Sequence, residues 1–452
     1  MYTSVLCPQQ IPNVELCRIL VYNDYDNDSV ILTDEGEVMK NNTEIQVGIG
    51  FATGRKNFKK VLNTYIYNWK ECGLIEPQNV RLNLFVMYDL KYNETKATDF
   101  TNISDTLSDM VDDIYFLDKE YMSNEIRLLI NENVLSETEA NLFFGSGYAS
   151  MRNTILFAAI KNKMDCLLFL DDDEYPVAVT KTHDTAIWSG QHVLKLHLQN
   201  IENADITNGH HCGYISPIPH IEFNDVLTEN DFKMFIEAIS NDIVNWECLK
   251  EVMNNGGLTY ADKNILMNNT LEEVPEISNA KFISGANLCI NLADPHRTSP
   301  FYNPPGARGE DTFLSTCLSD RKVLRLPCYT FHDGFSIYNH LLSGVLPTKL
   351  NRIEADSKRV ISRFYRACIG WIRYKPLFLY ITKRDDYNDE IEHMRRNLQI
   401  TLPKFCSYFN SNDFMRISKE LEIYHKNVEH HYKQFMDNQA IWTKICDQLL
   451  GS

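Results

Sequence analysis

The first strongly patterned segment of the chain is residues 44–73, EIQVGIGFATGRKNFKKVLNTYIYNWKECG. It opens with an apolar run that ends in a glycine-containing turn. The apolar residues that follow recur at the spacing of one helix face: Phe58, Val61, Leu62, Tyr65 and Trp69. This change of period predicts a buried strand, a tight turn and an amphipathic helix, in that order.

Apolar runs and helical patterns alternate over the next hundred residues. Two short runs end at Asp89, in VRLNLFVMYD, and at Asp118, in DDIYFLDKE. The helical pattern YASMRNTILFAAIKNKM then leads into a further run that ends at Asp171, in DCLLFLDDDEYP. Strands that alternate with helices are typical of a doubly wound, mostly parallel sheet, which binds ligands beyond the carboxyl ends of its strands. We therefore expect an α/β protein whose site includes these strand ends.

The pattern changes after residue 176. Apolar runs in ADITNGHHCGYIS and AKFISGANLCINL predict two further strands, separated by an acidic helical stretch at residues 228–254, and the chain from about residue 351 onward has helical periodicity. Two short β patterns around an acidic turn at residues 18–38 predict an N-terminal β-hairpin. We therefore divide the chain into three parts: a β-hairpin extension at 1–43, a central α/β domain at 44–345 and a C-terminal helical region at 346–452.

The acidic turn near the N-terminus also fits part of a calcium-loop pattern. Asp24, Asp26, Asp28 and Glu35 occupy positions 1, 3, 5 and 12 of that pattern. Ser29 stands where the loop requires glycine, however, and the flanking segments predict strands rather than helices. A solvated turn is therefore favoured over a calcium site.

Composition narrows the range of partners and compartments. The 452 residues are 44% hydrophobic and carry a formal net charge of −17, which disfavours general nucleic-acid binding and favours a small or neutral substrate. The twelve cysteines form no C-x-x-C pair, and several lie in apolar runs, which indicates a reducing compartment. The N-terminus lacks a signal-peptide pattern, and no apolar run approaches the roughly 18 residues of a membrane span. We expect a soluble, cytoplasmic protein.

Three consecutive aspartates at residues 171–173 follow the apolar run LLFL. Adjacent carboxylates repel one another unless water or a cation compensates them. A solvated strand end explains the cluster without a ligand, but its place beyond a buried strand also suits a divalent cation. Downstream, His332 ends a short apolar run in LPCYTFHDGF, where a neutral imidazole can act as a further metal ligand or serve a purely structural role.

Three other segments contain residues suited to binding or catalysis. GSGYASMRN ends in Arg152 and Asn153, where a helix entry places hydrogen-bond donors near a phosphate or base. PPGARGEDTFLS sets Glu310 and Asp311 at the start of a helix, a position that N-terminal capping alone also favours. ISGANLCIN contains a Gly-Ala turn, where backbone can approach a substrate closely.

Taken in this order, these segments resemble inverting glycosyltransferases of the GT-A fold, in particular those of glycosyltransferase family 2. VGIGFATGR is similar to the family's first strand and turn, which hold the nucleotide, and MRN resembles its Arg-Asn helix entry. LFLDDDE looks like its Asp-x-Asp motif, and GED looks like its catalytic-base motif. The match spans about residues 44–335 and departs from the family at YDLKYNETK, which lacks the usual acidic-Gly-Ser turn.

The resemblance implies a fold, a reaction and a set of site residues. The fold is GT-A, and the reaction is transfer of a sugar, here a hexosyl group, from a nucleotide-diphosphate sugar to a hydroxyl of a glycan, lipid-linked or small-molecule acceptor. Mn²⁺ or Mg²⁺ would be the cofactor, and a ligand set with one imidazole favours Mn²⁺. The residues that match the family's nucleotide-sugar-binding positions are Thr53, Arg55, Asp89, Arg152, Asn153, Asp171, Asp172, Gly285 and Ala286. Those that match its metal ligands are Asp171, Asp173 and His332. The resemblance also implies inversion at the anomeric carbon, with Asp311 as the general base beside Glu310.

Four other functions share parts of the pattern. A retaining GT-A transferase would use the metal site without Asp311 as a base. A metal-dependent phosphatase would use the aspartates at 171–173, although its motif has Thr or Val where this chain has Tyr175. A nucleotidyltransferase needs a Gly-rich basic loop, of which GFATGRKNF is a poor version. A sugar-nucleotide-binding module without activity would need none of the catalytic acids.

Residues 352–384 raise a separate question, because they contain nine basic residues, only two acidic ones and interleaved aromatic residues. Such a segment can rest on anionic lipid at the inner face of the membrane and present a lipid-linked acceptor. A helix packed on the catalytic domain explains the same pattern. We favour the packed helix and keep peripheral membrane contact as the alternative.

Overall fold

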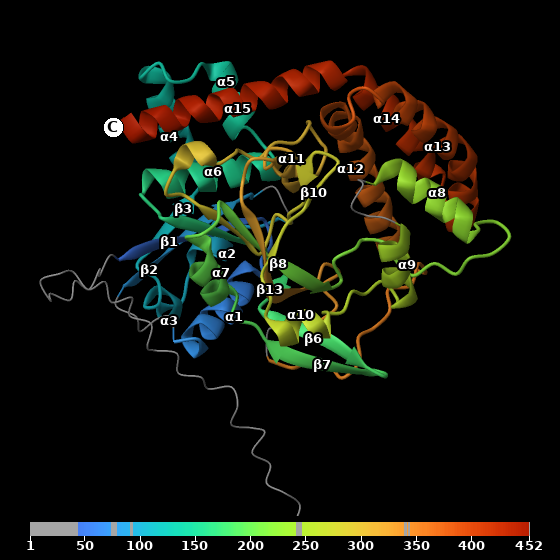
Figure 1. The fold of residues 1–452 in the computed structure, drawn as a ribbon, viewed down its shortest axis with the longest axis horizontal. Coiled ribbons are helices and arrows are strands. Elements are labelled where there is room, and N and C mark those ends of the chain that lie inside the picture. Colours follow the sequence, from blue (N-terminus) through green and yellow to red (C-terminus); the bar gives the residue numbers. More distant parts are fainter. Residues whose placement is uncertain are drawn as a thin grey trace, which may run out of the picture. The chain divides into compact units, whose positions relative to one another are not determined.

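The structure, a computed structural model, describes residues 44–73, 79–90, 94–240, 246–338, 341 and 344–451. Residues 44–452 form one compact unit (Figure 1). The predicted N-terminal β-hairpin and the calcium-loop pattern lie outside the described residues, so both stay predictions. The proposed boundary between residues 345 and 346 also stays a prediction.

A nine-stranded sheet forms the centre of this unit, with the order β3-β2-β1-β4-β12-β8-β13-β5, and β9 pairs with β13. Its strands are β1 (Ile45–Thr53), β2 (Val80–Tyr88), β3 (Asp113–Leu117), β4 (Cys166–Leu170), β5 (Glu174–Tyr175), β8 (Ile206–Gly213), β9 (Glu272–Glu273), β12 (Leu288–Asn291) and β13 (Val323–His332). Two small antiparallel ribbons accompany it: β6 (Val177–Thr182) with β7 (Thr185–Gly190), and β10 (Glu276–Ile277) with β11 (Ala280–Lys281).

The predicted α/β class is confirmed, but the expectation of a mostly parallel sheet is wrong, because the sheet is mixed. β3, β2, β1 and β4 are parallel neighbours, whereas β12 runs antiparallel to both β4 and β8. β13 is parallel to β8 and antiparallel to β5 and β9. A buried strand has the same continuous apolar pattern in either direction, so the pattern LCIN did not reveal the orientation of β12.

The order of the first four strands determines where a ligand can bind. The chain passes from β1 outward to β2 and β3, and then returns to β4 on the other side of β1. Such a reversal of strand order leaves a crevice beyond the carboxyl ends of the two central strands. In the pairing of β1 with β4, Phe51 lies opposite Leu170, so the turn after β1 and the aspartates after β4 are neighbours.

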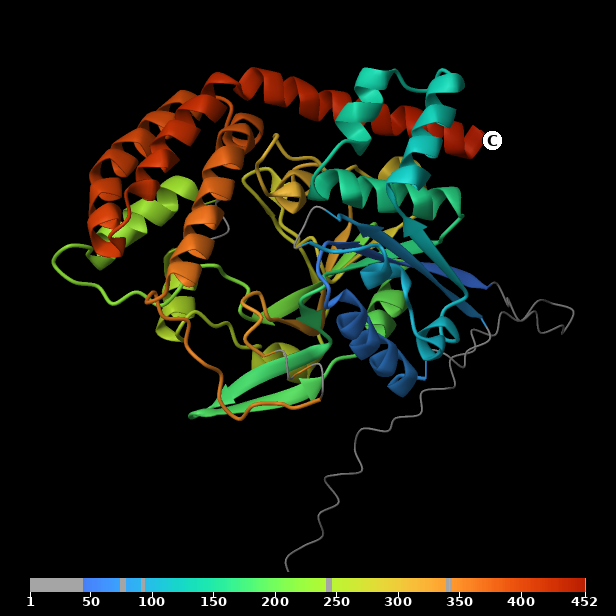
Figure 2. The same cartoon turned by 180° about the vertical axis from the view of Figure 1, so that it is seen from behind.

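Helices cover both faces of the sheet (Figure 2). α1 (Phe58–Glu71) and α7 (Val193–Ile201) contribute to the core on one face, and α6 (Tyr148–Lys161) packs on the other. Glycine at position 50 allows the close approach of α6, because a Cβ there would lie 2.8 Å from Ile155 Cγ2. The other α-helices described before residue 320 are α2 (Thr98–Thr101), α3 (Asp105–Ser108), α4 (Lys119–Asn131), α5 (Glu137–Phe144), α8 (Glu229–Ile239), α9 (Trp246–Asn254), α10 (Lys263–Asn268) and α11 (Glu310–Ser315).

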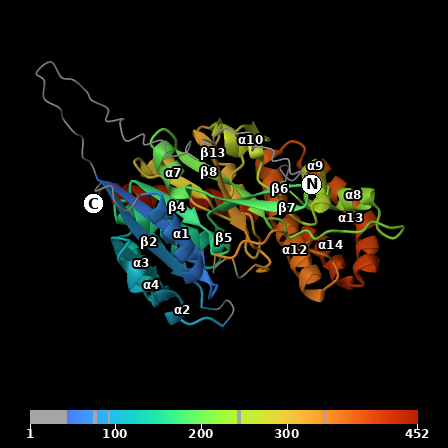
Figure 3. The same ribbon diagram turned by 90° about the horizontal axis from the view of Figure 1, so that it is seen from below.

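The predicted C-terminal helical region is confirmed. It comprises α12 (Lys358–Thr382), α13 (Tyr387–Phe409), α14 (Arg416–Lys426) and α15 (Val428–Gly451). α12, α13 and α14 lie beside α8 and α9 (Figure 3), and the five helices share a core rich in aromatic side chains. α15 returns to α5, where Trp442 stacks on Phe143 with ring centroids 5.7 Å apart. Among the described helices, none combines the length and the apolar composition needed to cross a membrane.

Candidate functional site

Two groups of acidic residues meet at the carboxyl ends of the strands. The carboxylate cluster, residues 171–173, follows β4 at the point where the strand order reverses. The acidic pair, Glu310 and Asp311, begins α11 after a glycine at position 309 with φ +94°, a conformation that glycine adopts without strain. One buried side chain, Arg152 from the first turns of α6, connects the two groups.

The turn after β1 supplies the partners of Asp172. Thr53 Oγ1 donates a hydrogen bond to Asp172 Oδ2, and Arg55 Nη1 lies 3.1 Å from Asp172 Oδ1. Arg55 also forms an ion pair with Asp173. Burial raises the pKa of Asp172 to about 7, although Arg55 opposes this shift. The predicted nucleotide-binding residues Thr53 and Arg55 therefore contact the carboxylate cluster directly.

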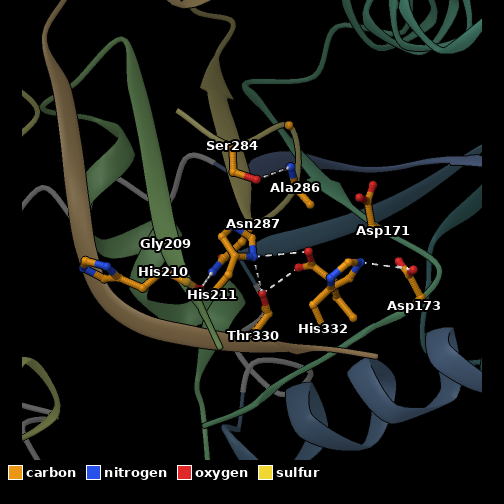
Figure 4. A network of polar contacts seen from close by, with 12 residues as sticks. Asp171, Asp173, Gly209, His210, His211, Ser284, Ala286, Asn287, Thr330 and His332 are labelled. Carbon is orange, nitrogen blue, oxygen red and sulfur yellow. Dashed lines mark hydrogen bonds and ion pairs between the residues drawn. The ribbon is translucent and has the colours of Figure 1, made fainter. Parts of the chain in front are cut away.

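Two of the predicted metal ligands, Asp173 and His332, lie side by side (Figure 4). His332 Nε2 is 3.1 Å from Asp173 Oδ2. Burial alone would raise the pKa of Asp173, but His332 and Arg55 outweigh it, and the pKa is lowered. Burial also opposes protonation of His332, yet Asp173 raises its pKa to about 9. Two cationic side chains thus compensate one buried carboxylate.

These donors fit a divalent cation once His332 releases its Nε2 proton, because the ligating nitrogen of an imidazole must be deprotonated. His332 Nδ1 is 2.9 Å from the carbonyl oxygen of Tyr214, and a hydrogen bond donated there leaves Nε2 as the atom that faces Asp173. Outer partners of this kind orient histidine ligands in metal sites. Asp171, the third predicted ligand, pairs with Arg152 instead. Among the residues that the structure describes, no three or more potential ligands surround a common point. Asp173 and His332 are the adjacent pair that would hold a cation.

Arg152 connects the carboxylate cluster with the acidic pair. It is 4% exposed, and its Nη2 lies 3.1 Å from Asp171 Oδ1. Its Nε lies 3.6 Å from Glu310 Oε1 and has no hydrogen-bond partner among the described residues. Because the pKa of this guanidinium is raised despite burial, chiefly by Asp171 and then by Glu310, Arg152 remains charged. One buried cation, Arg152, therefore pairs with carboxylates from two segments that are far apart in the sequence.

The turn at Gly285 and Ala286 lies against the same arginine. The Gly285 carbonyl accepts a hydrogen bond from Arg152 Nη1 at 2.5 Å, and its N–H donates to Asp311 Oδ2 at 3.3 Å. A Cβ at position 285 would lie 3.1 Å from Arg152 Nη2, so this close approach favours glycine. The Ala286 N–H donates to Ser284 Oγ at 3.4 Å (Figure 4).

Asp311 differs from the buried aspartates in its partners. Its Oδ1 accepts a 2.8 Å hydrogen bond from the backbone N–H of Thr312, and its Oδ2 accepts the one from Gly285. Burial, followed by the negative charge of Glu310, raises the pKa of Asp311 to about 6. A carboxyl group with this pKa is deprotonated at neutral pH and is a stronger base than an ordinary aspartate.

Two other predicted binding residues, Asn153 and Asp89, form hydrogen bonds with the backbone of neighbouring segments. The side-chain amide of Asn153 pairs with both backbone groups of Phe301, at 2.9 and 2.7 Å, so it anchors the loop before α11. Asp89 is exposed at the end of β2, where its backbone N–H donates to the carbonyl of Thr53 at 3.0 Å. It therefore shares the strand-end edge of the sheet with Thr53.

A polar network behind His332 was not anticipated from the sequence. Glu174 is buried, and its carboxylate accepts a 2.6 Å hydrogen bond from Thr330 Oγ1 and lies 3.2 Å from His211 Nδ1. Burial would raise the pKa of Glu174, but His211 outweighs it, and the pKa is lowered. The histidine pair in NGHHCGY was the available signal, because two adjacent histidines place one side chain on each face of a strand.

Two cavities flank this region. The basic cavity, of about 460 Å³, is lined by five basic residues and by part of the loop after β13: Arg55, Lys56, Asn57, Gly334, Phe335, Ser336, Arg359, Arg363 and Arg366. The second, of about 810 Å³, lies on the side of Glu310 and is lined largely by neutral polar and aromatic side chains from α5, α6 and α15 and from the loop before α11. The first borders the carboxylate cluster through Arg55, and the second borders the acidic pair.

The basic segment at residues 352–384 is divided between two environments. Arg359, Arg363 and Arg366 line the basic cavity, whereas later basic residues pair with protein groups. Arg373 binds Glu420 at 2.8 Å, and Lys375 Nζ donates to the carbonyl of Glu237 at 2.6 Å. Most of α12 from Ala367 onward is buried. Peripheral membrane contact stays a prediction, confined to the first part of this helix.

Neither a protein family model nor any of the curated proteins matches the chain by sequence.

Proposed function

We propose that the protein is a metal-dependent glycosyltransferase that moves a hexosyl group from a nucleotide-diphosphate sugar to an acceptor hydroxyl, with inversion. The observation that carries the proposal is the position of Arg152, 3.1 Å from Asp171 and 3.6 Å from Glu310. Two acidic groups connected in this way suit the two tasks of the reaction, which are binding the charged end of the donor and accepting a proton from the acceptor.

The proposal includes the GT-A fold. It is supported by the opening β1-turn-α1 unit and by the aspartates that follow β4. It is also supported by the strand order β3-β2-β1-β4, whose reversal brings the ends of β1 and β4 together.

We assign binding of the nucleotide-sugar donor to the carboxylate cluster. A cation held by Asp173 and His332 would neutralise the negative charge that grows on the leaving diphosphate. Arg55 already contacts Asp172 and Asp173. If Asp173 held the cation, Arg55 would be placed to donate a hydrogen bond to a phosphate oxygen. Thr53, which donates to Asp172, keeps that carboxylate next to Arg55.

We assign proton transfer from the acceptor hydroxyl to Asp311. Its raised pKa lets it accept the proton of the acceptor hydroxyl at neutral pH, and hydrogen bonds from Gly285 and Thr312 hold its carboxylate in one orientation. Glu310, the neighbouring residue, borders the larger cavity and lies near Arg152. We assign Glu310 to orienting the acceptor or Arg152, because adjacent residues on a helix point in different directions.

A binding screen tests this assignment before the acceptor is known. Thermal unfolding is measured with a panel of nucleotide-sugars, each with Mn²⁺ and with excess chelator. We expect one class of nucleotide-sugar to raise Tm only with the cation, since a ligand that binds the folded state stabilises it. Asp173→Asn should lose this effect. Asp113→Asn, which changes an exposed aspartate at the start of β3, should keep it. If no nucleotide-sugar raises Tm, or if the rise is the same with chelator, the proposal fails.

A further inference from the structure

The basic cavity combines side chains from two segments that lie about 300 residues apart in the sequence. Arg55 and Lys56 come from the turn after β1, and Arg359, Arg363 and Arg366 come from the first half of α12. Among the described residues that line the cavity, none is acidic. A concave site with one sign of charge concentrates the opposite charge, so this cavity suits an anion.

The three arginines of α12 lie close together on one face of the helix, because their positions differ by four and three residues. Phe335 contacts two of them: Arg359 Nη2 donates to its carbonyl at 3.0 Å, and the Arg363 guanidinium lies 4.4 Å from the centroid of its ring. Two turns later in the same helix, Arg373 binds the carboxylate of Glu420. Like charges at this spacing repel one another, so an anion bound among the first three would relieve that repulsion.

The cavity lies directly beside the candidate site. Arg55, which lines it, is the residue that contacts Asp172 and Asp173. Gly334, also in its wall, separates Arg363 from His332, because a Cβ at position 334 would lie 2.5 Å from Arg363 Nη2 and 2.7 Å from His332 Cε1. A group held in the cavity would therefore lie next to the residues that we assign to the donor.

The residues that line the basic cavity favour binding of a compact oxyanion over binding of a nucleoside or a sugar. Among the described lining residues, Phe335 is the one aromatic side chain, and the Arg363 guanidinium lies over its ring. A base therefore lacks an open aromatic face to stack on. Several guanidinium groups around one space match the oxygen atoms of a phosphate, which can accept two hydrogen bonds from each arginine.

We propose that the basic cavity binds a phosphate group of the acceptor while the nucleotide-sugar occupies the side of the carboxylate cluster. The assignment to the acceptor rests on the proposed glycosyl transfer, whereas phosphate binding in the cavity does not. The phosphate can belong to a lipid headgroup or to a soluble phosphorylated acceptor, because the two present the same chemistry to the cavity.

The first experiment measures phosphate binding alone. Tm is followed as inorganic phosphate replaces chloride at constant ionic strength, with chelator present and no nucleotide. We expect a saturable rise for the wild type and its loss in the triple variant Arg359→Gln/Arg363→Gln/Arg366→Gln. A matched triple variant, Lys119→Gln/Lys195→Gln/Lys426→Gln, removes three exposed charges elsewhere and should keep the rise. Equal rises in all three proteins would overturn the proposal.

A milder variant keeps the proposal testable if the triple variant misfolds. Lys56→Gln/Arg366→Gln changes two exposed side chains of the cavity and leaves Arg359 and Arg363 in place. It should bind inorganic phosphate several-fold more weakly than the wild type, with an unchanged Tm in chloride. Unchanged phosphate affinity in this variant would also overturn the proposal.

The second experiment separates the cavity from the donor site. Inorganic phosphate is titrated into protein saturated with Mn²⁺ and the nucleoside diphosphate that gives the largest thermal shift. We expect phosphate to bind with nearly the same affinity as without the nucleotide. Displacement of phosphate by the nucleotide would assign the cavity to the donor and overturn the proposal. If phosphate binds but no nucleotide does, the proposed transfer and the acceptor assignment fail together, and only the phosphate site remains.

A third comparison identifies the source of the phosphate. Glycerol 3-phosphate represents a soluble acceptor, and phosphatidylcholine vesicles with and without phosphatidic acid represent a lipid surface. Binding of the soluble phosphate supports a soluble acceptor. Sedimentation of the wild type, but not of the arginine triple variant, with phosphatidic acid vesicles supports a lipid acceptor. Binding of neither probe would contradict the acceptor assignment.

Discussion

The carboxylate cluster and the acidic pair show how the same chemical group acquires two different properties. Asp173 has two cationic neighbours, Arg55 and His332, and its pKa is lowered. Asp311 has backbone N–H groups and the negative Glu310 as neighbours, and its pKa is raised to about 6. The first environment stabilises the charged carboxylate, as the proposed cation site requires, and the second raises the affinity of the carboxylate for a proton, as the proposed base requires.

This difference follows from the positions of the cations rather than from burial. Burial opposes ionisation of both Asp173 and Asp311. Arg55 and His332 lie against the carboxylate cluster, however, whereas Arg152 is shared between the two groups. The comparison predicts that loss of Asp173 affects donor binding, that loss of Asp311 affects turnover, and that the two losses separate in experiments.

Replacement of the proposed base should have the largest effect. Asp311→Asn keeps the size of the side chain and removes its ability to accept a proton, so turnover should fall by roughly 10² to 10⁴, the range for loss of general-base catalysis. Affinity for the nucleotide-sugar should remain. Turnover and donor affinity are measured together, with Glu310→Gln as the matched neighbour, for which we expect a smaller loss. Near-normal turnover of Asp311→Asn would remove Asp311 from this role.

Replacement of the proposed metal ligand should act on binding instead. Asp173→Asn keeps the shape of the site but weakens cation binding. We expect affinity for a nucleoside diphosphate with Mn²⁺ to fall by about 100-fold or more, because loss of an outer-sphere partner alone costs about 10- to 100-fold. Calorimetric titration with Mn²⁺ and with chelator measures the change. Asp113→Asn is the control. The comparison breaks down if Asp173→Asn binds like the wild type, or if binding is independent of the cation.

The raised pKa of Asp311 predicts the pH dependence of turnover. A base acts only when it is deprotonated, so turnover at saturating donor should be constant above pH 7 and fall about tenfold per pH unit below pH 6. The profile is recorded from pH 4.5 to 8.5, with folding checked by circular dichroism at each pH. A plateau that extends to pH 5 would show that the essential base is not Asp311, because its pKa is raised to about 6.

The smallest expected effect is on stability. Folding raises the pKa of Asp311, so its protonated form is favoured in the folded protein, and its contribution to stability is lost as pH rises from about 4 through 6. Asp311→Asn has no such loss, and its free energy of unfolding relative to wild type should increase by at most about 3 kcal/mol between pH 4 and 7. Urea unfolding at several pH values measures this difference. A relative stability that falls with rising pH would contradict the environment described for Asp311.

Much of the fold follows from periodicity. The strand and helix at residues 45–71 are predicted by the change from an apolar run to helical spacing. The strand buries both of its faces and the helix buries one face, so each leaves its own pattern in the sequence. The direction of β12 could not be predicted, since it depends on the path of the preceding loop and not on the strand's own residues. Orientation within the sheet is a long-range property that local pattern does not encode.

The sequence likewise predicted some residues of the candidate site but not the contacts between them. The aspartates at 171–173 are visible because three charges follow an apolar run, and the structure brings Asp173 to His332 across 158 intervening residues. The role of Arg152 as the link to Glu310 depends on a contact between α6 and α11 that no local signal reports. Asn153 shows that a residue predicted to bind the ligand can make a structural contact instead. Its neighbour Arg152 faces the site, whereas the Asn153 amide bonds to the backbone of Phe301.

The most direct test of the account is the configuration of the first product formed from the nucleotide-sugar that binds. With water as the acceptor, the sugar released in the presence of Mn²⁺ is observed by proton NMR before its anomers equilibrate. The account predicts that the anomer opposite to that of the donor appears first and that Asp311→Asn abolishes its formation. Release of the anomer with the donor's own configuration, or equal release by Asp311→Asn, would contradict it.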